Sequence, residues 1–443
     1  MQENIVFNDE TGSVSDEMRV QLEASYKHAL ADWMARLPSP HPLDIKLTIV
    51  SSLERGRIAE TEVAGLKTIA YRDNGAGVRL MPHAAYKAIT GIDNQEDVAD
   101  IDVRIPRRMV DALSFDGTFD VVHRYDATTL FRHEVAHALF MAAAPDPAKG
   151  NVTGWQSNVI EGDGVTTVFG AHARAFLPAG IPLANPVHLD PDVARRFGSA
   201  LGAQLPQGVA VKISALDEAL MSDSGLPTAL NDRMVFGPWY HGEVDMGGGL
   251  DLAVIQAPGN QYRISHETDK ITLASKIRYA APGGDEGAFK PELTLHNVER
   301  IQFSNTLLAF DVDGHAGQAY RLSRTVYGED QPDAVLARQL QALDQGKALR
   351  TLAGELVATD DFSARYGSAA SGADLITRFY HGILGRAPDA AGAEFWRKCM
   401  AEGLGEDQLL FYFAESSEHK ELTSPLLGIV LQINMEEPMW QVG

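Results

Sequence analysis

Hydrophobic residues recur along the first third of the chain with two different periods. Residues 14–36 place apolar side chains at helical spacing, and a cluster of prolines ends that pattern. Residues 43–51, 58–71 and 100–105 alternate apolar and polar side chains, which is typical of strands with one buried face. A run without glycine or proline then spans 127–144 and predicts a helix that stops at two following prolines. The order of helix, strands and helix predicts an α+β fold.

The remaining chain changes character several times. Residues 145–236 hold scattered glycine and proline and are predicted to be rich in loops, with a closing helix over 213–226. Short strand-like runs and glycine-rich turns follow, and predict a small β module. A helical part comes next, with a weak internal repeat of about 56 residues that indicates stacked helical units. The last part is an apolar tail without clear structure. The expected division is 1–235, 236–315, 316–425 and 426–443.

Composition and charge restrict the classes of partner. The 443 residues carry a formal net charge of -22, which argues against nucleic-acid binding because that function needs a basic surface. No apolar run reaches the roughly 18 residues of a membrane span, so none is expected. The one cysteine, Cys399, excludes an intrachain disulfide. The acidic N-terminus lacks the basic and apolar segments of a cleaved signal peptide.

The strongest chemical signal is the pentapeptide from His133 to His137 within the predicted helix. Residues four apart lie on one face of a helix, so the two imidazoles can bind one metal ion. Glu134 falls on the same side and can reach a metal-bound water, where it is the candidate general base. This spacing predicts a zinc site, because imidazole nitrogens are common zinc ligands.

Several motifs around this helix resemble those of bacterial zincin metalloproteases found in exported proteins. The resemblance covers residues 5–228 and includes the strand DIDVRI, the helix motif HEVAHALF, the segments TVFGAH and PVHL, and the helix from residue 213 to 227. It implies a zincin-like catalytic domain, in which a mixed sheet lies over the metal-binding helix and its edge strand holds an extended peptide.

A catalytic zinc ion takes a third protein ligand, and the sequence leaves several candidates. His188 matches the late HL element of the resembling family and is the preferred choice. Glu161 lies at a spacing typical of proteases whose third ligand is a glutamate, although two nearby glycines make a helix there unfavourable. His172 and Asp163 are the remaining alternatives.

The second half of the chain is similar to type I-secreted and surface-layer bacterial proteins. Residues 298–322 and 384–396 resemble a widespread repeat of unknown function in such proteins. This similarity implies a secreted or cell-surface location, export by type I secretion machinery, and an export signal in the tail 426–443. Residues 311–314 also resemble part of a calcium loop, but a β-turn is favoured because the later glutamate of an EF-hand is missing.

Two functions follow as expectations. The first is a secreted zinc endopeptidase, in which His133, His137 and His188 hold zinc and Glu134 activates water against protein or peptide substrates. The alternative is a non-catalytic surface-associated or adhesion protein with a degenerate zincin domain. Two departures favour this alternative. Phe140 replaces a glycine of the family one turn after His137 and is expected to crowd the site, and the metzincin pattern HExxHxxGxxH is absent because Phe140 and Ala143 occupy its last glycine and histidine positions.

Overall fold

The computed structural model describes the chain apart from residues 1–4, 55–56, 73–76, 94, 96–97, 116–123, 145–149, 163, 268–269, 281–286, 368–371, 428–429 and 436–443. The chain divides into two compact units, unit 1 with residues 1–298 and unit 2 with residues 299–443. The expected α+β class is confirmed as a mixed chain with several small sheets and a helical C-terminal region. The finer boundaries at 235, 315 and 425 stay predictions.

A four-stranded mixed sheet positions the site in unit 1. Its spatial order is β1 (Ile5–Asp9), β2 (Ile45–Val50), β6 (Ile101–Pro106) and β3 (Glu60–Val63). The first three strands run parallel, and β3 pairs antiparallel with β6. Because β6 is the one partner of β3 among the described strands, β3 forms an edge of this sheet.

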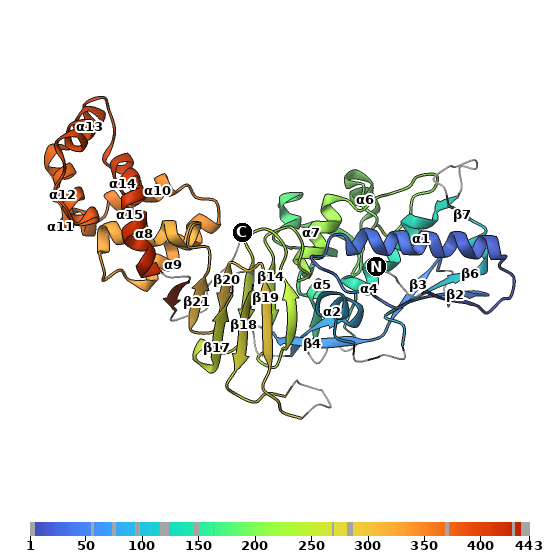
Figure 1. The fold of residues 1–443 in the computed structure, drawn as a ribbon. Coiled ribbons are helices and arrows are strands. Elements are labelled where there is room, and N and C mark those ends of the chain that lie inside the picture. Colours follow the sequence, from blue (N-terminus) through green and yellow to red (C-terminus); the bar gives the residue numbers. More distant parts are fainter. Residues whose placement is uncertain are drawn as a thin grey trace. The chain divides into compact units, whose positions relative to one another are not determined.

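Two helices pack together on this sheet (Figure 1). They are α1 (Asp16–Met34) and α4 (Ala127–Leu139), which carries the HEVAH motif. The carboxylate of Asp126 caps α4 by accepting the Thr129 N–H at 2.7 Å, which satisfies an otherwise unpaired backbone donor. The indole of Trp33 donates to the carbonyl of Arg132 at 2.8 Å and so ties α1 to α4.

The other elements of unit 1 are short. A β10–β13 sheet follows α4 in sequence and is antiparallel throughout. The remaining strands form a β15-β19-β18-β17 sheet, a β4-β5-β9 sheet, the parallel pair β7 and β8, and the parallel pair β14 and β16. Their bounds are β4 Leu66–Tyr71, β5 Val78–Pro82, β7 Leu113–Ser114, β8 Tyr125–Asp126, β9 Val152–Thr153, β10 Val159–Gly162, β11 Val165–Val168, β12 Ile181–Asn185, β13 His188–Leu189, β14 Arg233–Phe236, β15 Gly242–Asp245, β16 Leu252–Ile255, β17 Tyr262–His266, β18 Lys270–Ser275 and β19 Glu292–His296. The short helices are α2 His83–Thr90, α3 Arg107–Val110, α5 Gly154–Ser157, η3 Ala173–Ala175, α6 Pro191–Phe197, α7 Ala215–Asp223 and η4 Gly259–Gln261.

Unit 2 combines three strands, which pair antiparallel in the order β20-β21-β22, with a series of helices (Figure 1). The helices start at residues 315, 333, 349 and 360, and again at 372, 390, 406 and 417, so each later start lies 57 positions after its counterpart. The expected repeat is therefore confirmed as two copies of four helices. The bounds are β20 Arg300–Gln302, β21 Thr306–Ala309, α8 His315–Tyr327, α9 Asp333–Asp344, α10 Leu349–Val357, α11 Asp360–Tyr366, α12 Gly372–Leu384, α13 Ala390–Ala401, α14 Glu406–Ala414, α15 Ser417–Leu427 and β22 Leu431–Asn434.

The structure corrects three local predictions. The helix with the HEVAH motif, α4, ends at Leu139 and does not continue to residue 144. The part after it is not mainly loop, because the β10–β13 sheet lies there. The tail contains β22, which pairs with β21.

Candidate metal centre

Three histidines of unit 1 converge at one point. The Nε2 atoms of His133 and His137 on α4 lie 3.2 Å apart, and each lies 3.1 to 3.2 Å from Nε2 of His188 on β13. Three atoms at these separations lie about 1.8 Å from their common centre, so an ion about 1 Å out of their plane is about 2.05 Å from each. That distance is the usual Zn–N bond length, so the three residues fit a zinc ion.

The hydrogen bonds of the rings identify which nitrogen carries the lone pair. Nδ1 of His133 lies 2.8 Å from the carbonyl oxygen of Ala200, and a carbonyl can only accept. Nδ1 of His188 lies 2.9 Å from Oδ1 of Asn185, which also accepts the backbone N–H of Val187 at 3.1 Å. Both Nδ1 atoms therefore donate, and in the neutral rings both Nε2 atoms present lone pairs to each other at 3.2 Å. A cation between them removes this repulsion, which is a physical reason for a metal here.

The carbonyl that orients His133 is itself held by a buried carboxylate. Asp217 on α7 accepts the backbone N–H of Ala200 at 3.2 Å and the hydroxyl of Ser199. It also accepts the backbone N–H of Ser214 at 2.9 Å as part of the α7 capping box. Burial raises the pKa of Asp217 to about 6. These bonds place a second layer of support behind the metal-facing ring.

Glu134 lies between the histidines in sequence and is attached to the sheet edge. Its carboxylate Oε2 accepts the hydroxyl of Thr61 on β3 at 2.5 Å, and its backbone carbonyl lies 3.1 Å from the same hydroxyl. Burial raises the pKa of Glu134, although the neighbouring His133 and the Thr61 hydroxyl act in the opposite direction. A carboxylate with a raised pKa is a stronger base, which suits proton transfer.

Burial also keeps two of the rings neutral. It lowers the pKa of His137 well below its usual value, and the neighbouring His133 and His188 lower it further. Burial, followed by the charge of His133, lowers the pKa of His188 to about 4. Because neutral imidazole is the form that ligates metals, both rings are available as ligands at neutral pH.

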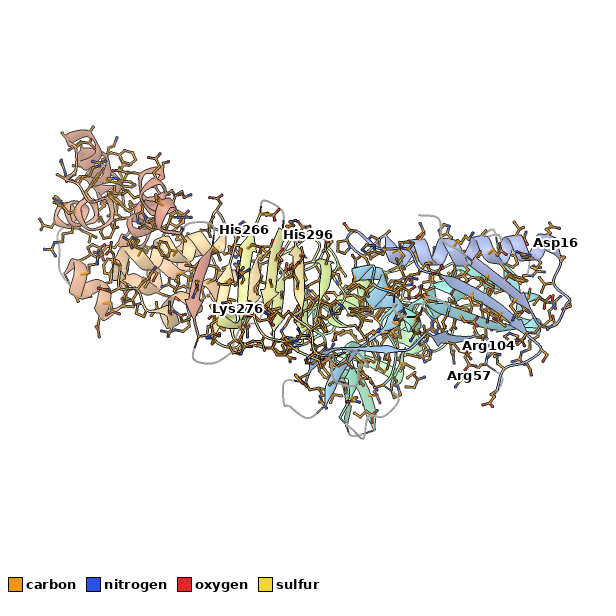
Figure 2. All side chains as sticks on the ribbon, turned by 60° about the horizontal axis from the view of Figure 1, so that its bottom comes forward. Asp16, Arg57, Arg104, His266, Lys276 and His296 are labelled. Carbon is orange, nitrogen blue, oxygen red and sulfur yellow. The ribbon has the colours of Figure 1, made fainter. Side chains whose placement is uncertain are left out.

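The histidine cluster opens into a cleft of about 760 Å³ in unit 1. One wall is the segment from Arg57 through the start of β3, and the opposite wall carries apolar side chains, including Val187 and Leu205. Arg57 is half-exposed on the side of unit 1 that also carries Arg104 of β6 (Figure 2), and it lies 3.5 Å from Glu60. The edge strand and the candidate ligands therefore border the same cavity.

The other third-ligand candidates lie elsewhere among the described residues. Glu161 is exposed on β10, opposite Thr166 of β11. Nδ1 of His172 lies 3.0 Å from Asp223, and this hydrogen bond raises the pKa of His172 above its usual value. Asp163 falls outside the described residues. The sequence preference for His188 thus agrees with the geometry, in which His133, His137 and His188 form one group of potential metal ligands.

Phe140 does not line the cleft, which corrects the expectation that it crowds the site. It follows the last residue of α4 with φ -145, so its side chain no longer continues the helical face of His137. The ring is buried and packs edge-on against Trp33 at 5.2 Å, with Trp155 at 6.4 Å. The side chain belongs to the core that joins α4 to α1.

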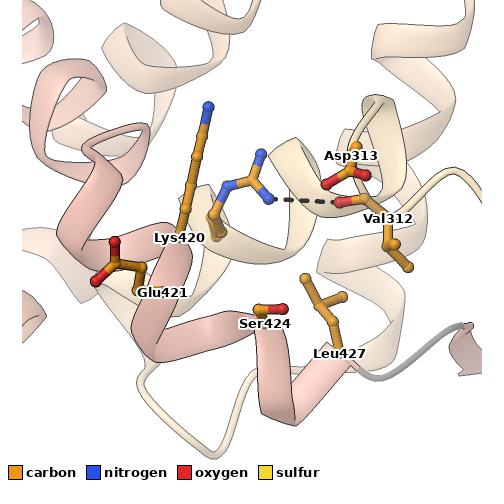
Figure 3. Close-up of a pocket in the computed structure, with 7 residues that line it drawn as sticks. Val312, Asp313, Lys420, Glu421, Ser424 and Leu427 are labelled. Atoms are coloured by element: carbon orange, nitrogen blue, oxygen red, sulfur yellow. Dashed lines mark hydrogen bonds between the residues drawn. The ribbon is translucent and has the colours of Figure 1, made fainter.

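The calcium-like segment 311–314 lies in unit 2, where its first carboxylate has another partner. Asp311 forms an ion pair with the buried guanidinium of Arg300. Asp313 lines a cavity of about 270 Å³ with Lys420 and Ser424, and nearby Arg321 donates to the carbonyl of Val312 (Figure 3). Neither aspartate belongs to a group of potential metal ligands among the described residues. Calcium binding stays a prediction.

Three supporting groups of the centre escaped the sequence analysis: the Thr61 hydroxyl, the Ala200 carbonyl and the Asn185 amide. Thr61 lies within a run that the alternation identified as strand-like, but alternation does not tell which strand borders the helix. The Ala200 carbonyl has no sequence signature, because every residue has one. Asn185 had a signal, since Asn-Pro marks a turn, and this turn precedes His188 by two residues.

Comparisons with known proteins bear on unit 2. Residues 353–423 match the family model described as a domain of unknown function (DUF4214). The match lies between the start of α10 and the end of α15, so it includes the segment 384–396 that resembled a secreted-protein repeat. A comparison with curated proteins finds no match. Among the described helices, none combines the length and the apolar character that crossing a membrane requires.

Proposed function

We propose that unit 1 is a zinc-dependent endopeptidase of the zincin type, which hydrolyses peptide bonds in protein or peptide substrates. One observation carries the proposal: three Nε2 atoms converge at 3.1 to 3.2 Å, those of His133 and His188 with their lone pairs facing each other, and Glu134 lies in the same cleft. The antiparallel edge strand above a helix with the HEVAH motif is the arrangement that the zincin resemblance implies.

Glu134 acts as the proton carrier in this mechanism. Bound zinc supplies Lewis acidity, which lowers the pKa of a water and polarises the substrate carbonyl. Glu134 accepts a proton from the attacking water while the water oxygen forms a bond to the carbonyl carbon. When the carbon–nitrogen bond breaks, Glu134 passes that proton to the leaving amine. Thr61 holds Oε2, and the described hydrogen bonds leave Oε1 to take the proton.

The edge strand β3 positions the substrate. Its outer backbone groups have no strand partner among the described residues, so an extended peptide can pair with them as an added strand. Thr61 on this strand contacts Glu134, so a peptide paired with β3 passes beside the general base. Apolar side chains on the opposite wall of the cleft favour an apolar substrate side chain there.

The direct test replaces the general base and leaves the ligands in place. Glu134→Gln is expected to lower peptide hydrolysis by about 10² to 10⁴-fold, because an amide cannot accept the proton. Zinc content is expected to equal that of the wild type. Glu161→Gln is the matched control, since Glu161 is an exposed carboxylate outside the cleft, and its activity should not change. Wild-type levels of hydrolysis in Glu134→Gln would refute this mechanism.

We also propose that the protein is exported, through type I secretion machinery, to the medium or the cell surface. The support is the resemblance of residues 298–322 and 384–396 to repeats of secreted and surface-layer proteins. Recovery of the intact chain from washed cells alone, with none in the medium or on the surface, would contradict this proposal.

The alternative function, a non-catalytic surface protein with a degenerate zincin domain, rests on Phe140 and on the missing metzincin pattern. The Phe140 side chain packs into the core and does not line the cleft. Its bulk is therefore no reason to expect an inactive site. The peptide assay separates the two functions, because the degenerate domain predicts no cleavage by the zinc-loaded wild type.

A further inference from the structure

A second group of potential metal ligands lies in unit 1, apart from the three histidines. His83 is the first residue of α2, Asp93 lies in the loop after this helix, and Asp100 directly precedes β6. Nε2 of His83 lies 3.4 Å from Oδ1 of Asp93 and 3.6 Å from Oδ1 of Asp100. The start of α2, the loop after it and the start of β6 are thus brought together with side chains that metals prefer as ligands.

These separations are too long for hydrogen bonds and match those of ligands around one ion. A hydrogen bond from an imidazole to a carboxylate spans about 2.7 to 3.2 Å. Nitrogen and oxygen ligands of a tetrahedral zinc ion, each about 2.1 Å from it, lie about 3.4 Å from each other. The three atoms therefore leave the space that a small divalent cation fills.

Burial without partners adds a second, independent observation. Asp100 is 0% exposed and its Oδ1 has no hydrogen-bond partner among the described residues, and both ring nitrogens of the 1% exposed His83 also lack one. A buried carboxylate oxygen without a partner costs several kcal/mol, roughly, in an apolar setting. A cation at this position would interact with the Asp100 oxygen and with the His83 ring, and so it would offset the cost of burying both.

The charges around the group also favour a divalent cation. Lys87, one turn after His83, contacts Oδ2 of Asp93 at 2.7 Å, Oδ2 of Asp100 at 2.8 Å and Oδ2 of Asp44 at 2.9 Å. The ammonium therefore binds the far oxygens of both candidate ligands and leaves their Oδ1 atoms facing His83. Three carboxylates against one ammonium leave two negative charges, which a divalent cation balances.

We propose that His83, Asp93 and Asp100 form a second site for a divalent transition-metal ion such as zinc. The ion joins the start of α2, the loop behind it and the start of β6, and so it stabilises the fold beside the main sheet. The side chain of Asp93 is 19% exposed, which provides a route of entry. This site does not depend on the proposed peptidase activity.

The second site is weaker than the histidine centre. Metal-ligating histidines usually donate their other ring nitrogen to an acceptor, and loss of that acceptor lowers metal affinity about 10 to 100-fold. His133 and His188 have such acceptors, whereas Nδ1 of His83 has none among the described residues. We therefore expect a chelator to remove the ion at His83 before the ion at the histidine centre.

Zinc content of the full chain tests the site. The chain is equilibrated with zinc, freed of excess by gel filtration and analysed by elemental analysis. We expect Asp93→Asn to hold one zinc equivalent fewer than the wild type, and the same loss in a His133→Gln/His137→Gln background. Asp102→Asn is the matched control, because Asp102 lies on β6 near Asp100 but pairs with Lys46 and is not in the ligand group. This control variant should keep the zinc content of the wild type.

A second variant protects the test against misfolding. Asp93 is partly exposed, so its replacement leaves the core intact, and circular dichroism checks the fold. His83→Gln should lose the same equivalent as Asp93→Asn. An unchanged zinc content in folded Asp93→Asn overturns the proposal, whichever value the wild type has, and so does the loss of an equivalent in Asp102→Asn.

Discussion

Replacing Asn185 by alanine removes one support of the metal centre and leaves all three histidines in place. Oδ1 of Asn185 accepts Nδ1–H of His188 at 2.9 Å and the backbone N–H of Val187 at 3.1 Å. Without this acceptor the His188 ring can rotate, and its proton can move to Nε2, which then no longer ligates. Asn185 is exposed, so the change should leave the fold nearly as stable as before.

The expected loss in zinc affinity follows from the role of such second-layer contacts. Removing an acceptor behind a metal-bound histidine weakens binding about 10 to 100-fold. This equals about 1.4 to 2.8 kcal/mol, since each tenfold change in affinity is about 1.4 kcal/mol. The effect should exceed that of a truncation at an exposed asparagine without such a partner.

The assay is a competition between the metal-free protein and a chromophoric chelator for zinc. Asn185→Asp is the conservative variant, because it keeps an oxygen acceptor at the same position, and its affinity should stay close to that of the wild type. His188→Ala should bind more weakly than either. An Asn185→Ala affinity within about twofold of the wild type would refute the reasoning that this hydrogen bond orients the ligand.

Three further predictions concern the edge strand, unit 2 and the pH dependence of stability. Thr61→Val should lower kcat/KM for peptides about 10 to 100-fold with zinc retained, because it removes a hydrogen bond to a charged carboxylate worth about 1.5 to 3 kcal/mol; Thr61→Ser should restore activity. Asp344→Ala should destabilise unit 2 by about 1.5 to 3 kcal/mol in urea unfolding, because it removes the charge-assisted hydrogen bonds of Asp344 to the buried guanidinium of Arg300, which keeps its pair with Asp311. Glu394→Ala, in an exposed pair, should cost at most about 1 kcal/mol. Burial raises the pKa of Asp232 to about 6. The protonated carboxyl therefore contributes fully to the free energy of unfolding below about pH 4, and this contribution, at most about 3 kcal/mol, is lost as the pH rises through 6. In thermal unfolding, the melting temperature of Asp232→Asn should fall less between pH 4 and pH 7 than that of the wild type. An identical fall in both proteins would contradict the raised pKa of Asp232.

The helix with the HEVAH motif could be located from the sequence because its signal is local. Two histidines four residues apart share a helical face wherever the helix lies, so their convergence needs no knowledge of the rest of the fold. The helix end was harder to place. The absence of glycine and proline up to residue 144 suggested a longer helix, but the chain leaves helical geometry at Phe140, where the ring enters the core against Trp33.

The second metal group was missed for the opposite reason. His83, Asp93 and Asp100 come from a helix start, a loop and a strand start, with no spacing that marks them as ligands. Because β2 and β6 pair in parallel with Ile45 opposite Ile101, the residues directly before these two positions, Asp44 and Asp100, also lie close together. Only this long-range pairing places the carboxylates beside α2, and periodicity along one segment cannot reveal it.

Phe140 illustrates why a substitution within a motif cannot be judged from helical spacing alone. Spacing places position 140 one turn after His137 and on nearly the same face, so a large ring there appeared incompatible with an open site. The backbone departs from the helix at this residue, and the ring fills space between Trp33 and Trp155. A glycine at this position would need other side chains to fill the same volume. Relative to the glycine of the resembling family, Phe140 thus changes how α4 packs against α1, and the proposed chemistry depends on the three imidazoles and Glu134.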